Sequence, residues 1–423
     1  WREGARRVTM LPSVEDRARG RAPLALLFFL AFLTSLVALT IDAVLPALDA
    51  MDRDLGFADA NARHDVVMAV FVGLAIAQAI VGPLADALGR RTIALAGLGL
   101  YLIGAIVAGL ATSPEMLIAG RFVQGLGAGG PRVVSIAVAR DLYEGRAMAR
   151  VVSLVNTVFM LVPMLAPLAG QGIEALGGWR AIFAFYALFA TVAALWYIAG
   201  MPETLSAEAR RPLRLRSVLQ GWGEVLRRRQ AVLAAGITIA VFGTFTAYLA
   251  TAQQILEEAY ALGPLFPLAF SGLAAAFACA SFLNSRLVMR FGMRRLSGIA
   301  LWQLTGTGLV GAGIAMATGG LPPLWLFLVL LGGAFVAVAV VFANMIALGT
   351  EGLEGAAGTA TSFLLGSSTL GASLIGSVIA AQYDGRVGFL FIGFAGLGAL
   401  ALILFAFLSP SRTAGAEDDR GMT

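Results

Sequence analysis

The sequence predicts an all-α polytopic membrane protein whose twelve transmembrane helices form two six-helix pseudo-repeats. Of its 423 residues, 59% are hydrophobic and 13% are charged, whereas a typical soluble domain carries about 25% charged residues. Its apolar runs are long enough to cross the hydrocarbon core as helices of about 20 residues, and they are too long for the strands of a membrane barrel. Irregular backbone facing lipid is excluded because its unpaired N–H and C=O groups cost too much.

Twelve apolar spans follow one another along the chain. We place them at 24–48, 65–85, 92–111, 116–139, 148–173, 179–200, 231–252, 264–283, 296–317, 323–345, 356–380 and 387–408. An even number of spans puts both ends of the chain on the same side. The longest connection separates six spans from six, so we divide the chain into an N-terminal tail (1–23), an N-terminal six-helix bundle (24–200), a central linker (201–230), a C-terminal six-helix bundle (231–408) and a C-terminal tail (409–423).

The arginines set the predicted orientation. All 30 basic residues are arginines, and 24 of them lie in the tails, the linker and the loops on the side of the N-terminus. Four lie on the opposite side, and two, Arg121 and Arg132, lie inside spans. The positive-inside rule therefore makes both termini cytoplasmic. The same distribution explains the net charge of +5 without a nucleic-acid partner.

The central linker leaves two interpretations open. Its apolar residues could form one face of a helix lying on the membrane surface, or the linker could be a polar connection with a helical piece. The residues of that apolar face are Leu213, Leu215, Val218, Leu219, Trp222 and Leu226.

Several kinds of site are not supported. Cys279, the single cysteine, lies in an apolar run and is expected to be a packed helix residue. His64, the single histidine, lies in a polar connection, where we expect no role for it. Neither belongs to a metal-ligand pattern, and a chain without lysine has no P-loop lysine for ATP. We therefore expect no metal, no cofactor and no enzymatic activity. Residues 1–9 precede Met10 and need not belong to the natural protein.

One polar stretch is repeated. GPLADALGRRT (82–92) lies between the second and third spans, and SRLVMRFGMRR (285–295) lies between the eighth and ninth. At an offset of 203 residues Gly89 falls on Gly292, whereas Asp86 falls on Met289. A repeated loop in two six-helix halves is typical of duplicated transporters, whose substrate site lies between the halves.

The stretch GPLADALGRRT resembles the loop motif of the major facilitator superfamily. Further stretches resemble motifs of its drug exporters: TIDAVLPAL (40–48), RFVQG (121–125), ARDLYEGRAMARVVS (139–153), VPMLAPLAGQGI (162–173) and GWRAIF (178–183). Together they are similar to the Bcr/CflA family of drug-resistance proton antiporters. The resemblance implies the major facilitator fold, a monomer in the bacterial cytoplasmic (inner) membrane, and a proton gradient as the energy source.

Three ionisable residues lie well inside the spans, where such groups are costly: Asp42, Arg121 and Arg132. Asp42 and Arg121 are both roughly 8–9 Å below the outer ends of their helices at 1.5 Å per residue, so they could meet directly or through a polar cavity. The resemblance implies that Asp42, followed by Pro46, takes and releases the coupled proton beside Arg121. A structural ion pair or a helix-end cap is the alternative.

The remaining candidate residues form three groups, and helix packing is the alternative explanation for each. A substrate cavity could be lined by Arg132, Gln124, Asn156, Phe159, Tyr248 and Gln253. The cytoplasmic gate motif comprises Gly82, Asp86, Gly89, Arg90, Arg91 and Asp141, with Asp141 as a candidate partner for Arg90. The fifth-helix antiporter motif that the resemblance implies comprises Pro163, Pro167 and Gly170, where prolines remove backbone donors and allow a bend.

These observations predict a proton-coupled secondary transporter that exports amphipathic drugs or metabolites by alternating access. Its expected partners are the small substrate, protons and the lipid bilayer. A proton- or cation-coupled symporter that imports a solute is the main alternative. A non-transporting membrane assembly factor fits less well, because the sequence shows neither a large soluble domain nor a catalytic cluster.

Overall fold

The computed structural model describes residues 23–143, 145–206, 208, 210, 215–351 and 357–408, and every regular element within them is a helix. Ten segments of this part of the chain are long and apolar enough to cross a membrane. The elements are α2 (Leu24–Asp42), η1 (Leu45–Ala47), α3 (Leu48–Leu55), η2 (Ala60–Arg63), α4 (His64–Leu88), α5 (Arg90–Gly109), α6 (Pro114–Leu142), α7 (Gly145–Gly200), α8 (Leu215–Arg227), α9 (Arg229–Gln253), η4 (Gln254–Ala259), η5 (Gly263–Leu265), α10 (Phe266–Phe291), α11 (Met293–Ala317), α12 (Leu324–Thr350), α13 (Ala357–Ala380) and α14 (Gly388–Ala406).

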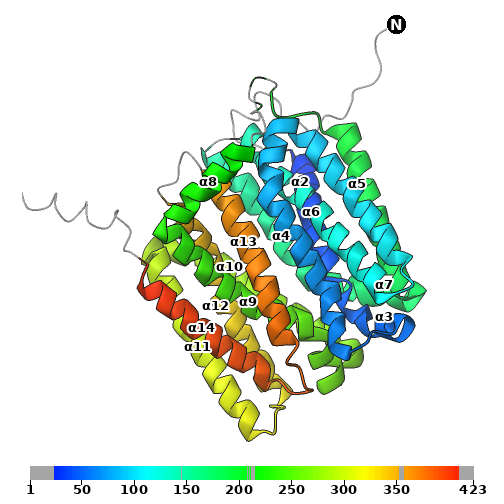
Figure 1. The fold of residues 1–423 in the computed structure, drawn as a ribbon, viewed down its shortest axis with the longest axis vertical. Coiled ribbons are helices and arrows are strands. Elements are labelled where there is room, and N and C mark those ends of the chain that lie inside the picture. Colours follow the sequence, from blue (N-terminus) through cyan, green and yellow to red (C-terminus); the bar gives the residue numbers. More distant parts are fainter. Residues whose placement is uncertain are drawn as a thin grey trace, which may run out of the picture.

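The helices pack as two bundles that lie side by side (Figure 1). The N-terminal bundle contains α2 and α4 to α7, and the C-terminal bundle contains α9 to α14. The bundles meet where α4 packs along α13 and where α7 packs against α10. In Figure 1, α8 lies across one end of the molecule and α3 lies at the opposite end. We call these the α8 end and the α3 end.

Glycines allow α6 to lie close to its neighbours. A Cβ atom on Gly120 would lie 2.6 Å from the backbone nitrogen of Ala108 in α5. A Cβ atom on Gly125 would lie 2.8 Å from Cα of Val70 in α4. Since side chains cannot approach backbone that closely, a larger residue at either position would separate the helices. Gly125 belongs to the RFVQG stretch, so part of that motif serves packing.

The two bundles share one backbone conformation at the repeated stretch. Gly89, between α4 and α5, has φ 97° and ψ 151°. Gly292, between α10 and α11, has φ 76° and ψ 150°. Glycine adopts a positive φ without the strain that other residues meet. The repeat predicted from the sequence is therefore present in the backbone.

Near Gly292, at the junction of α10 and α11, uncharged side chains form a cluster of amide hydrogen bonds. Asn284 of α10 donates to Asn344 of α12 at 3.0 Å, and Nδ2 of Asn344 lies 3.2 Å from Oγ of Ser297 and 3.4 Å from the Met293 carbonyl. Both asparagines are buried. Neutral hydrogen bonds thus join α10, α11 and α12 at the α8 end.

One expectation for the spans needs correction. The first span is not one helix ending near residue 48: α2 stops at Asp42, and the chain continues through η1 and α3 to Leu55. The fifth and sixth spans, by contrast, are confirmed as two helical stretches of α7 that meet at a kink, where Gly178 has φ 72°. The backbone remains helical through Pro163 and Pro167, so neither proline interrupts α7.

Cys279 is also placed differently from the expectation. It was expected to be packed, but it is exposed on α10. Phe282 and Leu283 of the same helix are more than half exposed as well. Apolar side chains need no burial against protein where they face lipid, which explains why an apolar run did not predict packing.

The central linker contains the helix α8. Val225 is fully buried in a small cluster with Ala231 and Ala360, and the ring of Trp222 lies 6.1 Å from that of Phe363 in α13. Leu226 remains 56% exposed. The helix therefore has one apolar side against the C-terminal bundle and further apolar surface outside it. Leu213 and the two tails, apart from Pro23, lie outside the described residues.

Candidate functional site

Asp42 lies where α2 stops being a helix. Pro46, four residues later, has no N–H, so the Asp42 carbonyl lacks the donor that a continuing helix would supply. The chain turns at Ala43 and re-enters helical geometry at η1. Asp42, the residue at this break, is 4% exposed. The spacing between the aspartate and the proline therefore places an acid at a buried helix end.

Arg121 binds the backbone around Asp42 instead of its side chain. Nη2 donates to the Thr40 carbonyl at 2.8 Å, Nε to the Val66 carbonyl at 3.1 Å, and Nη1 to Oε1 of Gln124 at 3.1 Å. The side chain is fully buried. A cation at a helix C-terminus stabilises the carbonyls that the helix leaves unpaired.

The possible direct contact between Asp42 and Arg121 is absent from the described part of the chain. The contact is absent because α2 ends here and leaves the Thr40 carbonyl without a helical partner. The Arg121 guanidinium donates to that carbonyl instead. Within the same residues, no hydrogen bond or ion pair reaches the Asp42 carboxylate.

Two tyrosines lie close enough to Asp42 for its charge to act on them. They are Tyr186 of α7 and Tyr248 of α9. The Tyr186 hydroxyl donates to the carbonyls of Leu39 and Thr40 at 3.1 and 3.3 Å. The Tyr248 hydroxyl is buried without a hydrogen-bond partner among the described residues. Tyr248 is therefore the phenol still available to the carboxylate.

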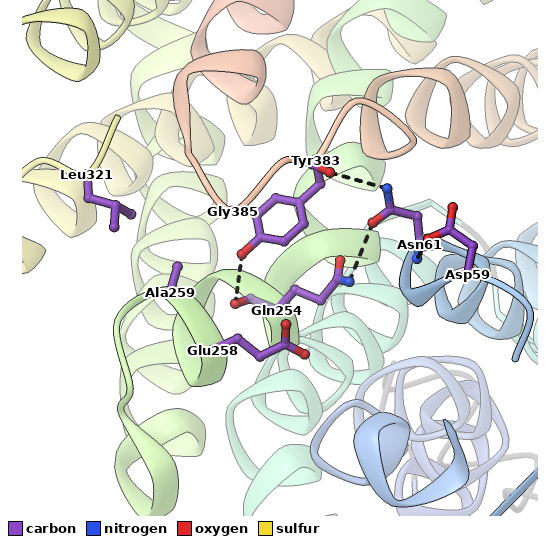
Figure 2. A pocket seen from close by; sticks show the side chains of 8 residues that line it. All are labelled: Asp59, Asn61, Gln254, Glu258, Ala259, Leu321, Tyr383 and Gly385. Atoms are coloured by element: carbon purple, nitrogen blue, oxygen red, sulfur yellow. Dashed lines mark hydrogen bonds between the residues drawn. The ribbon is translucent and has the colours of Figure 1, made fainter. Parts of the chain in front are cut away.

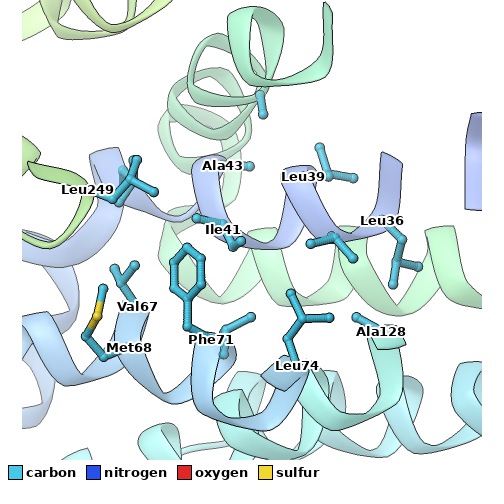
Figure 3. Close-up of a cluster of buried hydrophobic side chains, with 14 of the residues drawn as sticks. Leu36, Leu39, Ile41, Ala43, Val67, Met68, Phe71, Leu74, Ala128 and Leu249 are labelled. Carbon is cyan, nitrogen blue, oxygen red and sulfur yellow. The ribbon is translucent and has the colours of Figure 1, made fainter. Parts of the chain in front are cut away.

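Apolar side chains surround this helix end (Figure 3). In Figure 3, Ile41 of α2 lies next to Phe71 of α4, and Leu249 of α9 belongs to the same cluster of buried side chains. Both bundles thus contribute to the enclosure of Asp42. A carboxylate buried without a hydrogen-bond partner is costly to the fold.

The six candidate cavity residues do not share one environment. Arg132 is half-buried on α6, and the side chains of Asn156 and Phe159 lie outside the described residues. The fully buried members are Gln124, Tyr248 and Gln253. The structure thus brings Tyr248 and Gln124 to the level of Asp42, and it does not test which residues contact a substrate.

The gate motif forms an ionic cluster at the α8 end. Arg90 pairs with Asp86 at 2.5 Å and with Asp141 of α6 at 3.2 Å. A Cβ atom on Gly82 would lie 3.2 Å from Oγ of Ser362 in α13. Arg90 therefore ties the start of α5 to α4 and α6, next to the seam with the C-terminal bundle.

Glu203 and Thr204, two linker residues that motif reasoning missed, complete this cluster. The Glu203 carboxylate accepts from the backbone N–H groups of Arg90 and Arg91 at 2.9 and 3.3 Å, which caps the N-terminus of α5. Thr204 donates to Oδ2 of Asp141 at 2.9 Å. The helix dipole of α5 favours an acid at the N-terminus of that helix. Nothing in the sequence, however, indicated that Glu203 lies beside Arg90.

We expect Asp141→Asn to slow transport more than Asp86→Asn. The Asp141 side chain is 16% exposed and accepts from two groups, whereas the Asp86 side chain is 44% exposed. An exposed ion pair contributes about 0–1 kcal/mol, and a buried hydrogen bond to a charge about 1.5–3 kcal/mol. Initial transport rates in proteoliposomes measure the difference. Equal rates for the two variants would contradict the assigned order.

A second cluster joins the two bundles at the α3 end. Arg63 contacts Asp49 and Asp52 of α3 at 3.5 and 3.4 Å and reaches Glu258 of η4 at 2.8 Å. His64 shares a 2.5 Å hydrogen bond with Gln254 of η4. His64, for which we expected no role, is therefore a buried contact between the bundles.

Glu258 and Gln254 of this cluster also line a pocket of about 550 Å³ (Figure 2). Asn61 donates to the Tyr383 carbonyl at 3.2 Å, and the Tyr383 hydroxyl donates to the Gln254 carbonyl at 3.1 Å. Burial raises the pKa of the Tyr383 phenol to about 12, so this hydroxyl stays protonated at physiological pH. The Asn61 contact therefore joins the two bundles at the α3 end, and the Tyr383–Gln254 contact lies within the C-terminal bundle.

Glu258→Gln is expected to favour separation of the bundles at the α3 end. The ion pair with Arg63 joins a buried guanidinium to a carboxylate that is 42% exposed, so its loss is worth about 1 kcal/mol, or roughly fivefold in population. Spin labels on Arg53→Cys and Asp384→Cys, in a Cys279→Ser background, report the separation by pulsed electron resonance. Glu115→Gln, an exposed acid on α6, is the control. An unchanged distance distribution for Glu258→Gln would refute this role.

The fifth-helix motif contacts the Asp42 region through glycine. A Cβ atom on Gly170 would lie 2.7 Å from the carbonyl carbon of Ala43, so α7 rests on the backbone next to Asp42. Directly after the kink at Gly178 in α7, Trp179 donates to Asp54 of α3 at 3.0 Å, and Arg180 pairs with that carboxylate. Asp54, which sequence reasoning missed, thus holds the GWRAIF stretch.

Comparison with known proteins gives a consistent picture. The model of the Major Facilitator Superfamily matches residues 27–374. The MFS-type transporter YdgK of Bacillus subtilis is 31% identical over 271 residues, covering 63% of this chain and 67% of that protein. A bicyclomycin resistance protein homolog of Haemophilus influenzae is 30% identical over 274 residues, covering 64% and 68%. Multidrug resistance protein MdtL of Escherichia coli is 36% identical over 143 residues, covering 34% and 36%.

Solved structures share the fold. The xylose transporter XylE of E. coli, in a partially occluded inward open conformation, aligns with a TM-score of 0.71 at 15% identity, covering 92% of this chain and 98% of that one. The human organic anion transporter MFSD10 aligns with a TM-score of 0.64 at 21% identity, covering 94% and 100%. Identities this low are evidence for a common architecture alone.

Proposed function

Because this chain belongs to the Major Facilitator Superfamily, we propose that it exports amphipathic drugs or metabolites in exchange for protons. The superfamily makes it a transporter of small molecules rather than an enzyme. The bicyclomycin and multidrug resistance relatives support drugs as the substrate class. The observation that supports proton coupling is the position of Asp42. This acid is buried at a helix break where both bundles meet, and it has no partner among the described residues.

The proposed cycle follows from that position. With Asp42 charged, an amphipathic substrate competes with a proton for the same site. Protonation releases the substrate, and the bundles rock between two openings around the fixed site. Arg121 holds the end of α2 in place through its carbonyls while the carboxylate changes charge.

The orientation belongs to the same proposal. The excess of arginines on one side supports a cytoplasmic α8 end, with both termini inside and the α3 end outside the bacterial inner membrane. The contacts between Arg63 and Glu258 and between His64 and Gln254 would then close the outer side.

Purified protein in liposomes with a lumenal pH dye tests the function. Bicyclomycin added outside, without a gradient, should make the lumen alkaline, because the drug enters as protons leave. Symport would make the lumen acidic. No pH change with bicyclomycin or chloramphenicol, relative to protein-free liposomes, would reject proton coupling for these drugs.

A further inference from the structure

We propose that α9 and η4 carry a proton route from the α3 end to Asp42, through Glu257, Gln253 and Tyr248. This inference rests on the proposed function, since it names how the coupled proton reaches its site. Asp42 is the acid inside the spans that the sequence singled out, and it lies deep in the molecule. A proton from the α3 side needs groups that can receive it on the way.

Glu257 is the entry group of this route. It is half-buried in the π-helical turn η4, and its carboxylate accepts from Nε2 of Gln253 at 2.9 Å. Glu174 of α7, Asp49 of α3 and the neighbouring Glu258 act on it electrostatically. Partial burial first, and then the neighbouring acids, favour the protonated form of this carboxylate, so it can collect protons at the α3 end.

Gln253 and Tyr248 are the inner groups. Gln253 is 2% exposed and Tyr248 is fully buried. Oε1 of Gln253 and the hydroxyl of Tyr248 have no hydrogen-bond partner among the described residues. Buried polar atoms are nearly always paired, so two unpartnered atoms on one helix, between an entry carboxylate and a buried acid, require an explanation. A hydrogen-bonded route supplies it.

The end of the route is the Asp42 carboxylate. Its charge acts on Tyr248, and α9 packs against η1, the segment that follows Asp42. Tyr186, the other phenol within reach of this charge, is committed to backbone carbonyls. Tyr248 is therefore the phenol that can donate to the carboxylate.

The transfer involves only O–H bonds. Glu257 gives its proton to water bound at Oε1 of Gln253, water gives one to the Tyr248 oxygen, and Tyr248 passes its original proton to Asp42. Each relay group ends as it began, and one proton has moved. No hydrogen bond joins Gln253 to Tyr248 among the described residues, and at 1.5 Å per residue their backbones are about 7.5 Å apart along the helix. The route is thus interrupted in this conformation, which limits leakage, and opening of the α3 end would admit water between them.

The rate of Asp42 protonation tests the route without any substrate. In liposomes with the α3 end outside, an external acid jump is followed by the infrared carboxyl band that Asp42→Asn removes. We expect Glu257→Gln and Tyr248→Phe each to slow this band at least tenfold. Tyr248→Phe retains the ring contacts with Phe270 and Phe335. Asp384→Asn, an outer carboxylate that binds its own loop, should leave the rate unchanged.

A rate unchanged in both variants would overturn the route, as would equal slowing by Asp384→Asn. Melting curves exclude misfolding as the cause of a slow band. Bicyclomycin exchange without a pH gradient should persist in both variants, because exchange needs no net protonation. If the wild-type protein moves no protons with drugs but shows the same infrared pattern, the proposed antiport fails while the route stands.

Discussion

Asp42→Asn is expected to reduce proton-driven transport to the level of protein-free liposomes while making the protein more stable. Asparagine keeps the size of the side chain but cannot bind the coupled proton. Since the carboxylate is 4% exposed and has no partner among the described residues, replacement by a neutral amide removes a desolvation cost of about 1–3 kcal/mol. The two effects have opposite signs, which distinguishes a coupling residue from a structural one.

Two measurements on the same preparation check this expectation. Drug-dependent lumenal pH change reports coupling, and thermal unfolding in detergent reports stability. Asp384→Asn is the matched control, because it removes an exposed carboxylate and should change neither. Retained coupling in Asp42→Asn would remove Asp42 from the mechanism. A lower melting temperature would reveal an ion pair that stabilises the native state.

Gly170→Ala is expected to have the second large effect. Its Cβ atom would lie 2.7 Å from the carbonyl carbon and 3.0 Å from Cα of Ala43. These are backbone atoms next to Asp42, so no flexible side chain can move away. The added methyl should destabilise the fold by about 1–3 kcal/mol and displace the Asp42 region, with transport falling at least tenfold, an activation change of about 1.4 kcal/mol or more.

Gly172→Ala provides a control on the same helix. No heavy atom lies within 4 Å of a Cβ at Gly172, so alanine there should stabilise the helix by about 0.5–1 kcal/mol. Melting temperatures and transport rates of the two variants are compared side by side. If both variants behave alike, helix flexibility rather than the contact with Ala43 explains the effect of the Gly170 substitution.

The hydrophobic pattern predicted most helices within a few residues, because each span had to cover the same membrane thickness. It did not predict the break after Asp42, although Pro46 was visible, since a proline can bend a helix as well as end it. It did predict the break between the fifth and sixth spans, which α7 shows at Gly178. Local patterns define which residues are apolar, and they do not define how a helix ends.

The site residues divide in the same way. Asp42, Arg121, Arg90 and Asp141 were found because charges are rare in apolar sequence. Glu203 and the pair His64–Gln254 were missed, since their roles come from partners 113 and 190 positions away. Such contacts arise only when the linker folds back or the bundles dock. The functional roles of these residues remain predictions that the experiments above address.

The two repeated junctions at the α8 end differ in their sensitivity to ionic strength. Around Arg90 the contacts are ionic, and around Asn344 they are amide hydrogen bonds. Dissolved ions screen charges over about 8 Å at physiological salt but leave neutral hydrogen bonds nearly untouched. Salt, or a change in the charge of the surrounding lipids, therefore acts on the Arg90 contacts and leaves the Asn344 hydrogen bonds nearly unchanged. The two sets of contacts at the repeated stretch therefore differ in how strongly ionic strength affects them.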